Sequence, residues 1–272
     1  MDWKDRLFTR LPRWGRTLAF NAYAARLRRL REGPALEEAM EALDTVDRAP
    51  AGEVERAQLE RINELLDWAC ERVPYYRSIL SAQDAPRRPL TSLAQLKQIP
   101  TLPRETLRQR PDDVTVPGLA RATGYTSGST GSPMPIRYDE RQLVWNRAAE
   151  MLVRRRAGLE RRDRVAVLFG RSLVPPRRRK PPFWIHNRVS DELWLSLSHL
   201  GEKTARHYLA ALRDYSAAAL DTYPSMAYLL ACLSRKLREP VQLRRVITSS
   251  EPLYPFQRAT IEEVFRAEVF EF

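Results

Sequence analysis

A short polar run, Thr126–Pro133, is the part of the sequence whose residue types best suit chemistry. It reads Thr-Ser-Gly-Ser-Thr-Gly-Ser-Pro, and its glycines, Gly128 and Gly131, let the backbone turn tightly, including at positive φ. Successive amide N–H groups in such a turn can point inward and form a nest for an anion. Five hydroxyl side chains add hydrogen-bond donors: Thr126, Ser127, Ser129, Thr130 and Ser132. Composition alone describes a triphosphate loop and a flexible linker equally well.

The neighbours of this run favour the phosphate loop. The semi-apolar segment Leu119–Tyr125 precedes it, and Pro133–Asp139 reads as the start of a strand. A flexible linker seldom lies between two ordered apolar segments. The run lacks the lysine of the Walker pattern, so it predicts a phosphate loop of another kind.

Composition limits the class of protein. The 272 residues are 43% hydrophobic and 29% charged, as in a globular chain, and we see no secretion signal and no membrane span. The two cysteines, Cys70 and Cys232, form no disulfide framework or metal site, so a reducing cytoplasm is expected.

The net charge of +12 raises the question of a polyanionic partner. Of the 46 basic residues 41 are arginine, spread along the whole chain, which favours a solvated basic surface. No aromatic–basic strand motif indicates RNA binding, so no nucleic-acid partner is expected. The basic segment 3–31 is helical in pattern, with a break near Pro12 and Gly15. We expect it to pack on its own domain; weak contact with an anionic membrane is the alternative.

The pattern of elements changes along the chain. Residues 54–72 predict a helix with Val54, Leu59, Ile62, Leu65, Leu66 and Ala69 on one face, and 91–111 predict two short helices. Strands are then predicted at 164–170, 192–200, 217–224, 243–253 and 267–272. Helices are predicted between them at 202–214, 225–239 (capped by Ser225) and 255–266. This alternation indicates an α/β fold: a helical N-terminal region followed by a mostly parallel βαβ sheet.

Ligands of parallel sheets collect beyond the carboxyl ends of the strands. Thr248–Glu251 and Asp221–Tyr223 are at such ends, and His199 ends the strand predicted at 192–200. His199 and Tyr223 are therefore candidates for a substrate pocket, although a structural histidine and a simple turn are the plainer interpretations. No metal site is predicted.

The order of residues in the loop, Tyr-Thr-Ser-Gly-Ser-Thr-Gly-Ser-Pro, resembles the phosphate loop of the adenylate-forming superfamily. Three further segments resemble its phenylacetate–CoA ligase-like branch: 65–80 with "VPYYR", 92–113, and "VITSSEPL" at 246–253. The opening segment resembles the CapK-like subset associated with capsular polysaccharide gene clusters. The resemblance covers nearly the whole chain.

The resemblance implies an ATP- and Mg²⁺-dependent ligase that joins AMP to a small carboxylate, with coenzyme A as an acceptor in many members. It implies that Thr126, Ser127, Gly128, Ser129, Thr130 and Gly131 hold the β- and γ-phosphates. Ser250, Glu251 and Pro252 would border the adenine. It further implies a helical part (1–115) and an ATP-binding α/β part (116–272) of one large domain.

The sequence departs from the family pattern in three places. Met134 replaces a lysine common after the loop, and the adenine turn reads Ser-Ser-Glu-Pro instead of Gly-Glu-Pro. The family's Tyr-Gly-x-[ST]-Glu motif and its small C-terminal domain would follow Phe272, so we expect an N-terminal fragment. The alternatives are a non-catalytic nucleotide-binding or scaffold descendant, and a basic protein that binds membrane or a polyanion.

From the missing motif we predict that the 272-residue chain alone does not complete adenylation. Pyrophosphate exchange into ATP, measured with a panel of carboxylates, should stay at background. Robust carboxylate-dependent exchange by the purified chain would contradict the prediction.

Overall fold

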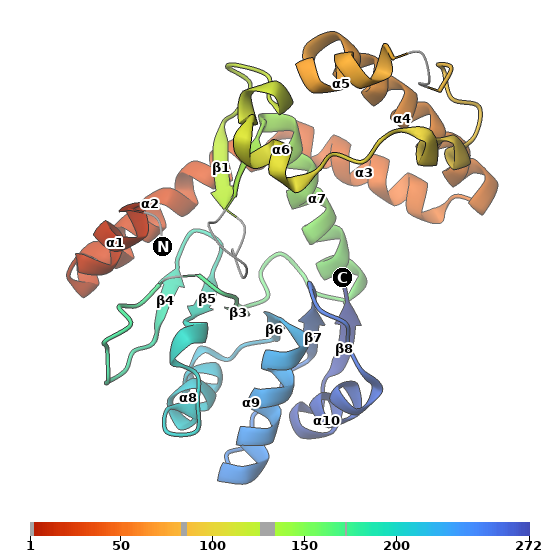
Figure 1. The fold of residues 1–272 in the computed structure, drawn as a ribbon. Coiled ribbons are helices and arrows are strands. Elements are labelled where there is room, and N and C mark those ends of the chain that lie inside the picture. Colours follow the sequence, from red (N-terminus) through yellow and green to blue (C-terminus); the bar gives the residue numbers. More distant parts are fainter. Residues whose placement is uncertain (1–2, 83–85, 126–133, 172) are drawn as a thin grey trace. The chain divides into compact units, whose positions relative to one another are not determined.

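The computed structural model describes residues 3–82, 86–125, 134–171 and 173–272 (Figure 1). The chain divides into two compact units. The first consists of residues 1–29 and 151–272, and the second of residues 30–150. The boundary predicted at residue 115 falls within the second unit. Each unit is described below by itself.

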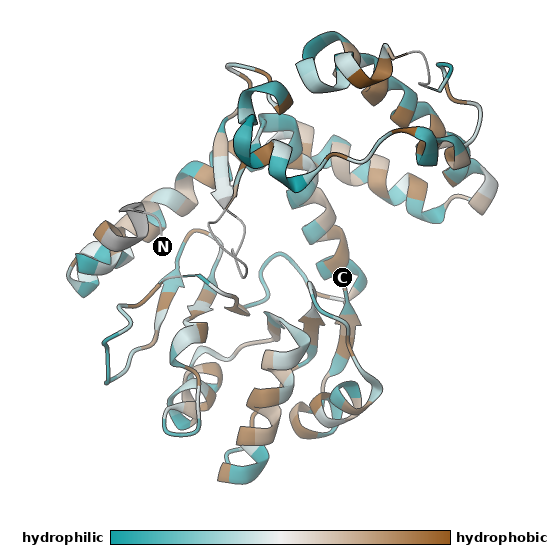
Figure 2. Cartoon of the chain, in the orientation of Figure 1, coloured by the Kyte–Doolittle hydropathy of each residue, from teal (hydrophilic) through white to brown (hydrophobic). Residues whose placement is uncertain are grey.

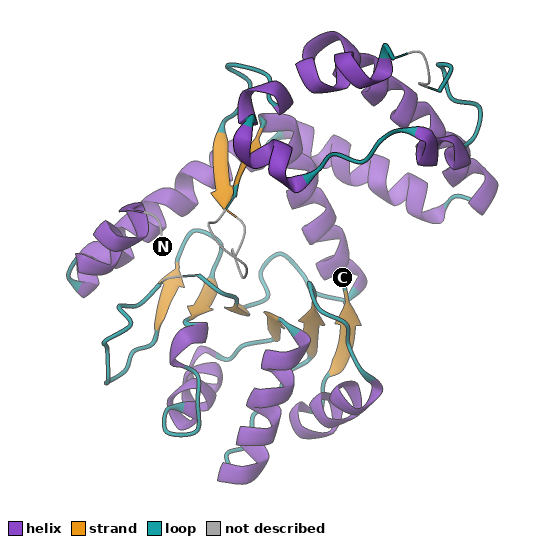
Figure 3. Cartoon of the chain, in the orientation of Figure 1, coloured by secondary structure: helices purple, strands orange, loops and turns teal. Residues whose placement is uncertain are grey.

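A six-stranded sheet forms the centre of the first unit (Figure 3). The spatial order is β4-β5-β3-β6-β7-β8, and all neighbours are parallel except β4 and β5. The strands are β3 (Val165–Leu168), β4 (Trp184–Asn187), β5 (Glu192–Leu195), β6 (Ala219–Thr222), β7 (Arg245–Thr248) and β8 (Glu268–Glu271). The predicted mostly parallel α/β fold is confirmed.

Three crossover helices cover one face of this sheet: α8 (Ala205–Tyr215), α9 (Pro224–Leu237) and α10 (Pro255–Phe265). Apolar residues on the strands, brown on β7 in Figure 2, pack against buried side chains of these helices such as Tyr208, Leu230 and Ile261. On the other face Val165, Val167, Ala219 and Ile247 pack with residues that follow helix α7, including Ala157. Burial on both faces explains why the strands read as continuous apolar runs.

The structure corrects several predicted bounds. The strand predicted at 192–200 ends at Leu195, and Leu197–His199 form a short 3₁₀ helix, η3. Pro224 does not close a turn but begins α9, where its fixed φ and missing N–H suit the first helical position. The N-cap residue is therefore Tyr223 rather than the predicted Ser225. The prediction also missed β4, because only four residues alternate there within a proline-rich segment.

Two helices, α1 (Trp3–Arg10) and α2 (Arg13–Arg31), replace the single pattern predicted over 3–31. The break occurs at Pro12 as predicted, whereas Gly15 lies inside α2. Phe8 and Phe20 pack against a small core that contains Ile185 of β4. The Asn21 amide donates to the His186 carbonyl (3.0 Å) and its Oδ1 accepts from the Arg188 amide (2.8 Å). The segment thus packs along the edge strand of its own unit.

The second unit is mostly helical. Its elements are α3 (Pro34–Arg48), α4 (Ala51–Arg72), α5 (Pro74–Leu80), η1 (Leu93–Gln98), α6 (Arg104–Gln109), η2 (Pro111–Val114), β1 (Ala122–Tyr125), β2 (Pro135–Tyr138) and the first part of α7 (Glu140–Arg156). Strands β1 and β2 pair antiparallel, so the strand predicted after the polar run is confirmed, and the semi-apolar segment before the run also contains a strand. Of the residues predicted on one face of α4, Leu66 and Ala69 are buried, whereas Leu65 is 60% exposed.

A buried ion cluster joins the end of α7 to the sheet of the first unit. The Arg154 guanidinium contacts the Glu192 carboxylate of β5 at 3.0 Å and the Asp221 carboxylate of β6 at 3.4 Å. Glu192 also accepts hydrogen bonds from the Asn187 amide and the Trp194 indole N–H. Because β5 and β6 are the two neighbours of β3, Arg154 spans the centre of the sheet.

We predict that Arg154→Met lowers the free energy of unfolding by about 3–5 kcal/mol, because it leaves buried carboxylates without their cation. Urea denaturation followed by circular dichroism measures the change. Arg162→Met is the matched control, since Arg162 pairs with Glu160 at the surface and its loss should cost less than about 1 kcal/mol. Equal effects of the two substitutions would contradict the role assigned to Arg154.

Candidate functional site

The carboxyl ends of three neighbouring strands lie level with one another in the first unit. Leu168 of β3, Thr222 of β6 and Thr248 of β7 are register partners, so the residues after them form one edge. The Ser249 amide donates to the Thr222 carbonyl at 3.2 Å and continues this alignment past the strands. This edge is where a parallel sheet presents its backbone and side chains to a ligand.

Tyr223 lies in the middle of this edge. Its ring packs edge to face on Phe169, with 4.9 Å between ring centroids. Among the described residues, only the Tyr223 hydroxyl comes within 4 Å of a Cβ added to Gly170, at 3.8 Å, and Gly170 itself is exposed. Within the described residues the Tyr223 hydroxyl has no hydrogen-bond partner. It is therefore available to a polar ligand.

The turn after β7 carries the three residues predicted to border adenine. Ser250 adopts a left-handed backbone, with φ of 69°, which glycine adopts at no cost and serine only with some strain. The Glu251 carboxylate accepts a hydrogen bond from the Ser225 amide (3.2 Å) in the first turn of α9, where the helix dipole favours negative charge. Glu251 thereby fixes the turn to the neighbouring strand end, and Pro252 follows it at the surface.

The hydroxyls of Ser249 and Ser250 lie 3.4 Å apart and make no other hydrogen bond within the described part of the chain. With Tyr223 they place three available hydroxyls on two adjacent strand ends. Sequence analysis had named Tyr223, Ser250, Glu251 and Pro252 as site residues. Ser249 lies within the strand end Thr248–Glu251 that the sequence indicated, whereas Phe169 was missed because the strand predicted at 164–170 ends in the structure at Leu168.

His199 does not join this group. Its Nδ1 lies 2.8 Å from the Ser196 hydroxyl, its Nε2 lies 3.1 Å from the Pro175 carbonyl, and its ring stacks on Phe183. Burial lowers the pKa of His199, which favours the neutral ring: Nε2–H donates to Pro175 and Nδ1 accepts from Ser196. Both nitrogens therefore serve to hold the loop at 175–183 against the end of β5.

The phosphate-loop residues Thr126, Ser127, Gly128, Ser129, Thr130 and Gly131 lie outside the described residues. The strands that flank them are described: Tyr125 of β1 and Pro135 of β2 are register partners at the end of the hairpin. The role of these six residues stays a prediction from the sequence.

No group of three or more His, Cys, Asp or Glu side chains is placed to hold a metal ion in the described ranges. Within the same ranges, no helix has the length and apolar character to cross a bilayer.

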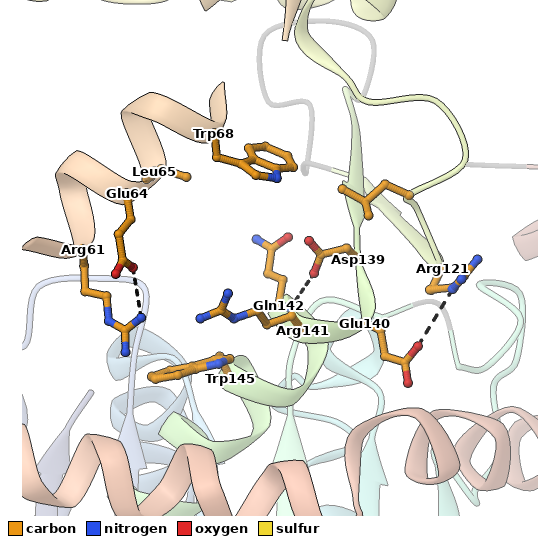
Figure 4. A pocket seen from close by; sticks show the side chains of 11 residues that line it. Arg61, Glu64, Leu65, Trp68, Arg121, Asp139, Glu140, Arg141, Gln142 and Trp145 are labelled. Atoms are coloured by element: carbon orange, nitrogen blue, oxygen red, sulfur yellow. Dashed lines mark hydrogen bonds and ion pairs between the residues drawn. The ribbon is translucent and has the colours of Figure 1, made fainter. Parts of the chain in front are cut away.

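A cavity of about 960 Å³ opens in the second unit (Figure 4). Trp68 of α4 and Trp145 of α7 lie on opposite sides, and the Arg141 side chain lies between them. Most other charges pair within the wall: Arg61 with Glu64 at 3.1 Å, and Arg121 with Glu140 at 4.0 Å. These pairs leave a mainly apolar hollow, which the sequence did not predict.

Comparison with known proteins gives the family context of this site. No protein-family model matches the sequence. The curated protein CapK of Staphylococcus aureus is 20% identical over 215 residues, which cover 78% of this chain and 48% of that protein. The chain thus spans about half the length of this relative.

Solved structures agree on the fold. A 2-hydroxyisobutyryl-CoA ligase, in complex with 2-HIB-AMP and CoA in an open conformation, superposes with a TM-score of 0.59 at 20% identity. The match covers 82% of this chain and 54% of that ligase. The same ligase in its thioesterification state gives 0.59 at 22% identity, covering 82% of this chain and 49% of that one. The sequence similarity to CapK and the fold shared with these ligases agree with the resemblance to the adenylate-forming superfamily.

Proposed function

We propose that this chain is the nucleotide-binding part of an ATP-dependent ligase that activates a carboxylic acid as its acyl-adenylate. The observation that carries the proposal is the group of available hydroxyls at adjacent strand ends, Tyr223, Ser249 and Ser250, beside a turn held by Glu251. A polar edge of this kind matches a nucleoside better than an apolar ligand.

The residues fit ATP in two groups. At the strand ends, Gly170, Tyr223 and the turn at Ser250 would border the adenine and the ribose. In the hairpin between β1 and β2, Thr126–Gly131 would supply amide and hydroxyl donors to the β- and γ-phosphates. Donors oriented in advance stabilise the charge that develops on pyrophosphate as it leaves.

The acyl acceptor and the pathway are proposed from the similarity to known proteins alone. The similar ligase that was solved with 2-HIB-AMP and CoA supports coenzyme A as the acyl acceptor. The opening segment resembles a subset of relatives associated with capsular polysaccharide gene clusters, and this resemblance is the basis for proposing a place in polysaccharide biosynthesis. Magnesium would neutralise the triphosphate, as it does for most ATP-dependent enzymes.

The turn after β7 provides the first test. We predict that ATP stabilises the chain against heat and that Ser250→Val weakens ATP and AMP binding about tenfold or more, because a β-branched residue is strained at positive φ. Ser250→Gly removes the hydroxyl but adopts the positive φ without strain, so it should bind both nucleotides more tightly than Ser250→Val does. Isothermal titration calorimetry measures the affinities.

Ser216→Val is the matched control for this test. Ser216 has a similar left-handed backbone, with φ of 54°, but it ends α8 at the amino side of the sheet. Its substitution should lower the melting temperature without changing nucleotide affinity. If Ser250→Val binds ATP as tightly as the natural chain, the turn does not border the nucleotide.

The polar run provides an independent test. We predict that Thr130→Val lowers affinity for ATP about tenfold or more and affinity for AMP little, since hydrogen bonds to charged phosphates are worth about 1.5–3 kcal/mol. Parallel titrations with ATP and AMP measure the difference. Equal losses for the two nucleotides would contradict the assignment of this residue to the β- and γ-phosphates.

A further inference from the structure

One side of the N-terminal helices is covered, and another remains exposed and apolar. Phe8 and Phe20 pack on the core of the first unit, and Asn21 is bonded to the backbone at the end of β4. Four other side chains are exposed and are called here the apolar stripe: Leu7, Leu11, Trp14 and Leu18. Packing on the chain's own unit therefore accounts for only part of this surface.

Exposed apolar side chains are concentrated in the N-terminal helices. Five of the 14 large apolar side chains exposed on the described chain fall between Leu7 and Tyr23. Trp14 is 73% exposed and Leu18 is 66% exposed, the largest values among them. Contiguous exposed apolar groups indicate an interaction surface, whereas single ones do not.

Positive charges predominate around the apolar stripe, although α1 contains Asp5. Helix α2 contains six arginines and no Asp or Glu. Arg10, Arg13, Arg26 and Arg29 are exposed, and none has an ion-pair partner among the described residues. Such a surface complements an anionic partner and repels another basic surface, including a second copy of this chain, whose net charge is +12.

Arg16 adds to this positive field. It is 5% exposed, and its Nε and Nη1 atoms are buried without a hydrogen-bond partner in the described part of the chain. Burial, with the charges of Arg178 and Arg13, lowers the pKa of Arg16. Arg178, in the basic segment Arg177–Lys180, is one of the charges that act on Arg16.

We propose that the apolar stripe and the arginines beside it bind the surface of an anionic phospholipid membrane. Leucine and tryptophan side chains enter the headgroup region of a bilayer, and exposed arginines contact the lipid phosphates. The contact with the membrane is peripheral. Helices α1 and α2 are separated at Pro12, and Phe8 and Phe20 hold them along the edge strand β4. The proposal is independent of the nucleotide site.

Vesicle flotation of the purified chain tests the proposal. The chain should float with phosphatidylglycerol–phosphatidylcholine vesicles, not with phosphatidylcholine alone, and less so as salt rises. Trp14→Ser with Leu18→Ser should lower the partition coefficient about tenfold or more, while the melting temperature stays near that of the natural chain.

Leu229→Ser with Phe256→Ser is the matched control, because both side chains are exposed apolar groups on helices of the same unit. This pair should float as the natural chain does. Equal losses from the two double substitutions, or no flotation of the natural chain, would overturn the proposal. Concentration-dependent dimerisation that Trp14→Ser with Leu18→Ser abolishes, seen by analytical ultracentrifugation, would overturn it in favour of a second copy.

Discussion

The bridge from Arg154 to Glu192 and Asp221 is the interaction on which the candidate site depends most. It joins α7 to β5 and β6, the strands on either side of β3. The site is made of residues that follow strand ends, so its geometry is only as fixed as the strand register. A buried cation shared by two strands holds that register in a way that apolar contacts, which are not directional, do not.

The residues of the edge are positioned through backbone geometry more than through side-chain contacts. Ser250 is held in a left-handed conformation, and Glu251 is fixed by the first turn of α9. Tyr223, which follows β6, occupies the N-cap position of the same helix. The first turn of α9 therefore positions residues after both β6 and β7. This arrangement leaves the hydroxyls of the edge unused by the fold and available for binding.

The sequence predicted much of this because its local signals are strong. Continuous apolar runs between helical patterns gave β3, β6, β7 and β8, and the order Ser-Ser-Glu-Pro located the turn. It missed β4, which has only four alternating residues, and placed the exposed Leu65 on one helical face with the buried Leu66 and Ala69. Arg154 lies 38 residues before Glu192 and 67 residues before Asp221 in the sequence, and no local periodicity predicts contacts over such separations.

The central claim is that nucleotide binds at the strand ends and at the polar run of the hairpin. Hydrogen–deuterium exchange of the chain with and without ATP tests both at once. The account predicts slower exchange in peptides that cover 126–133 and 249–253, with no change along α3 and α4. Unchanged exchange in both peptides at saturating ATP, or protection confined to the walls of the cavity near Trp68 and Trp145, would contradict it.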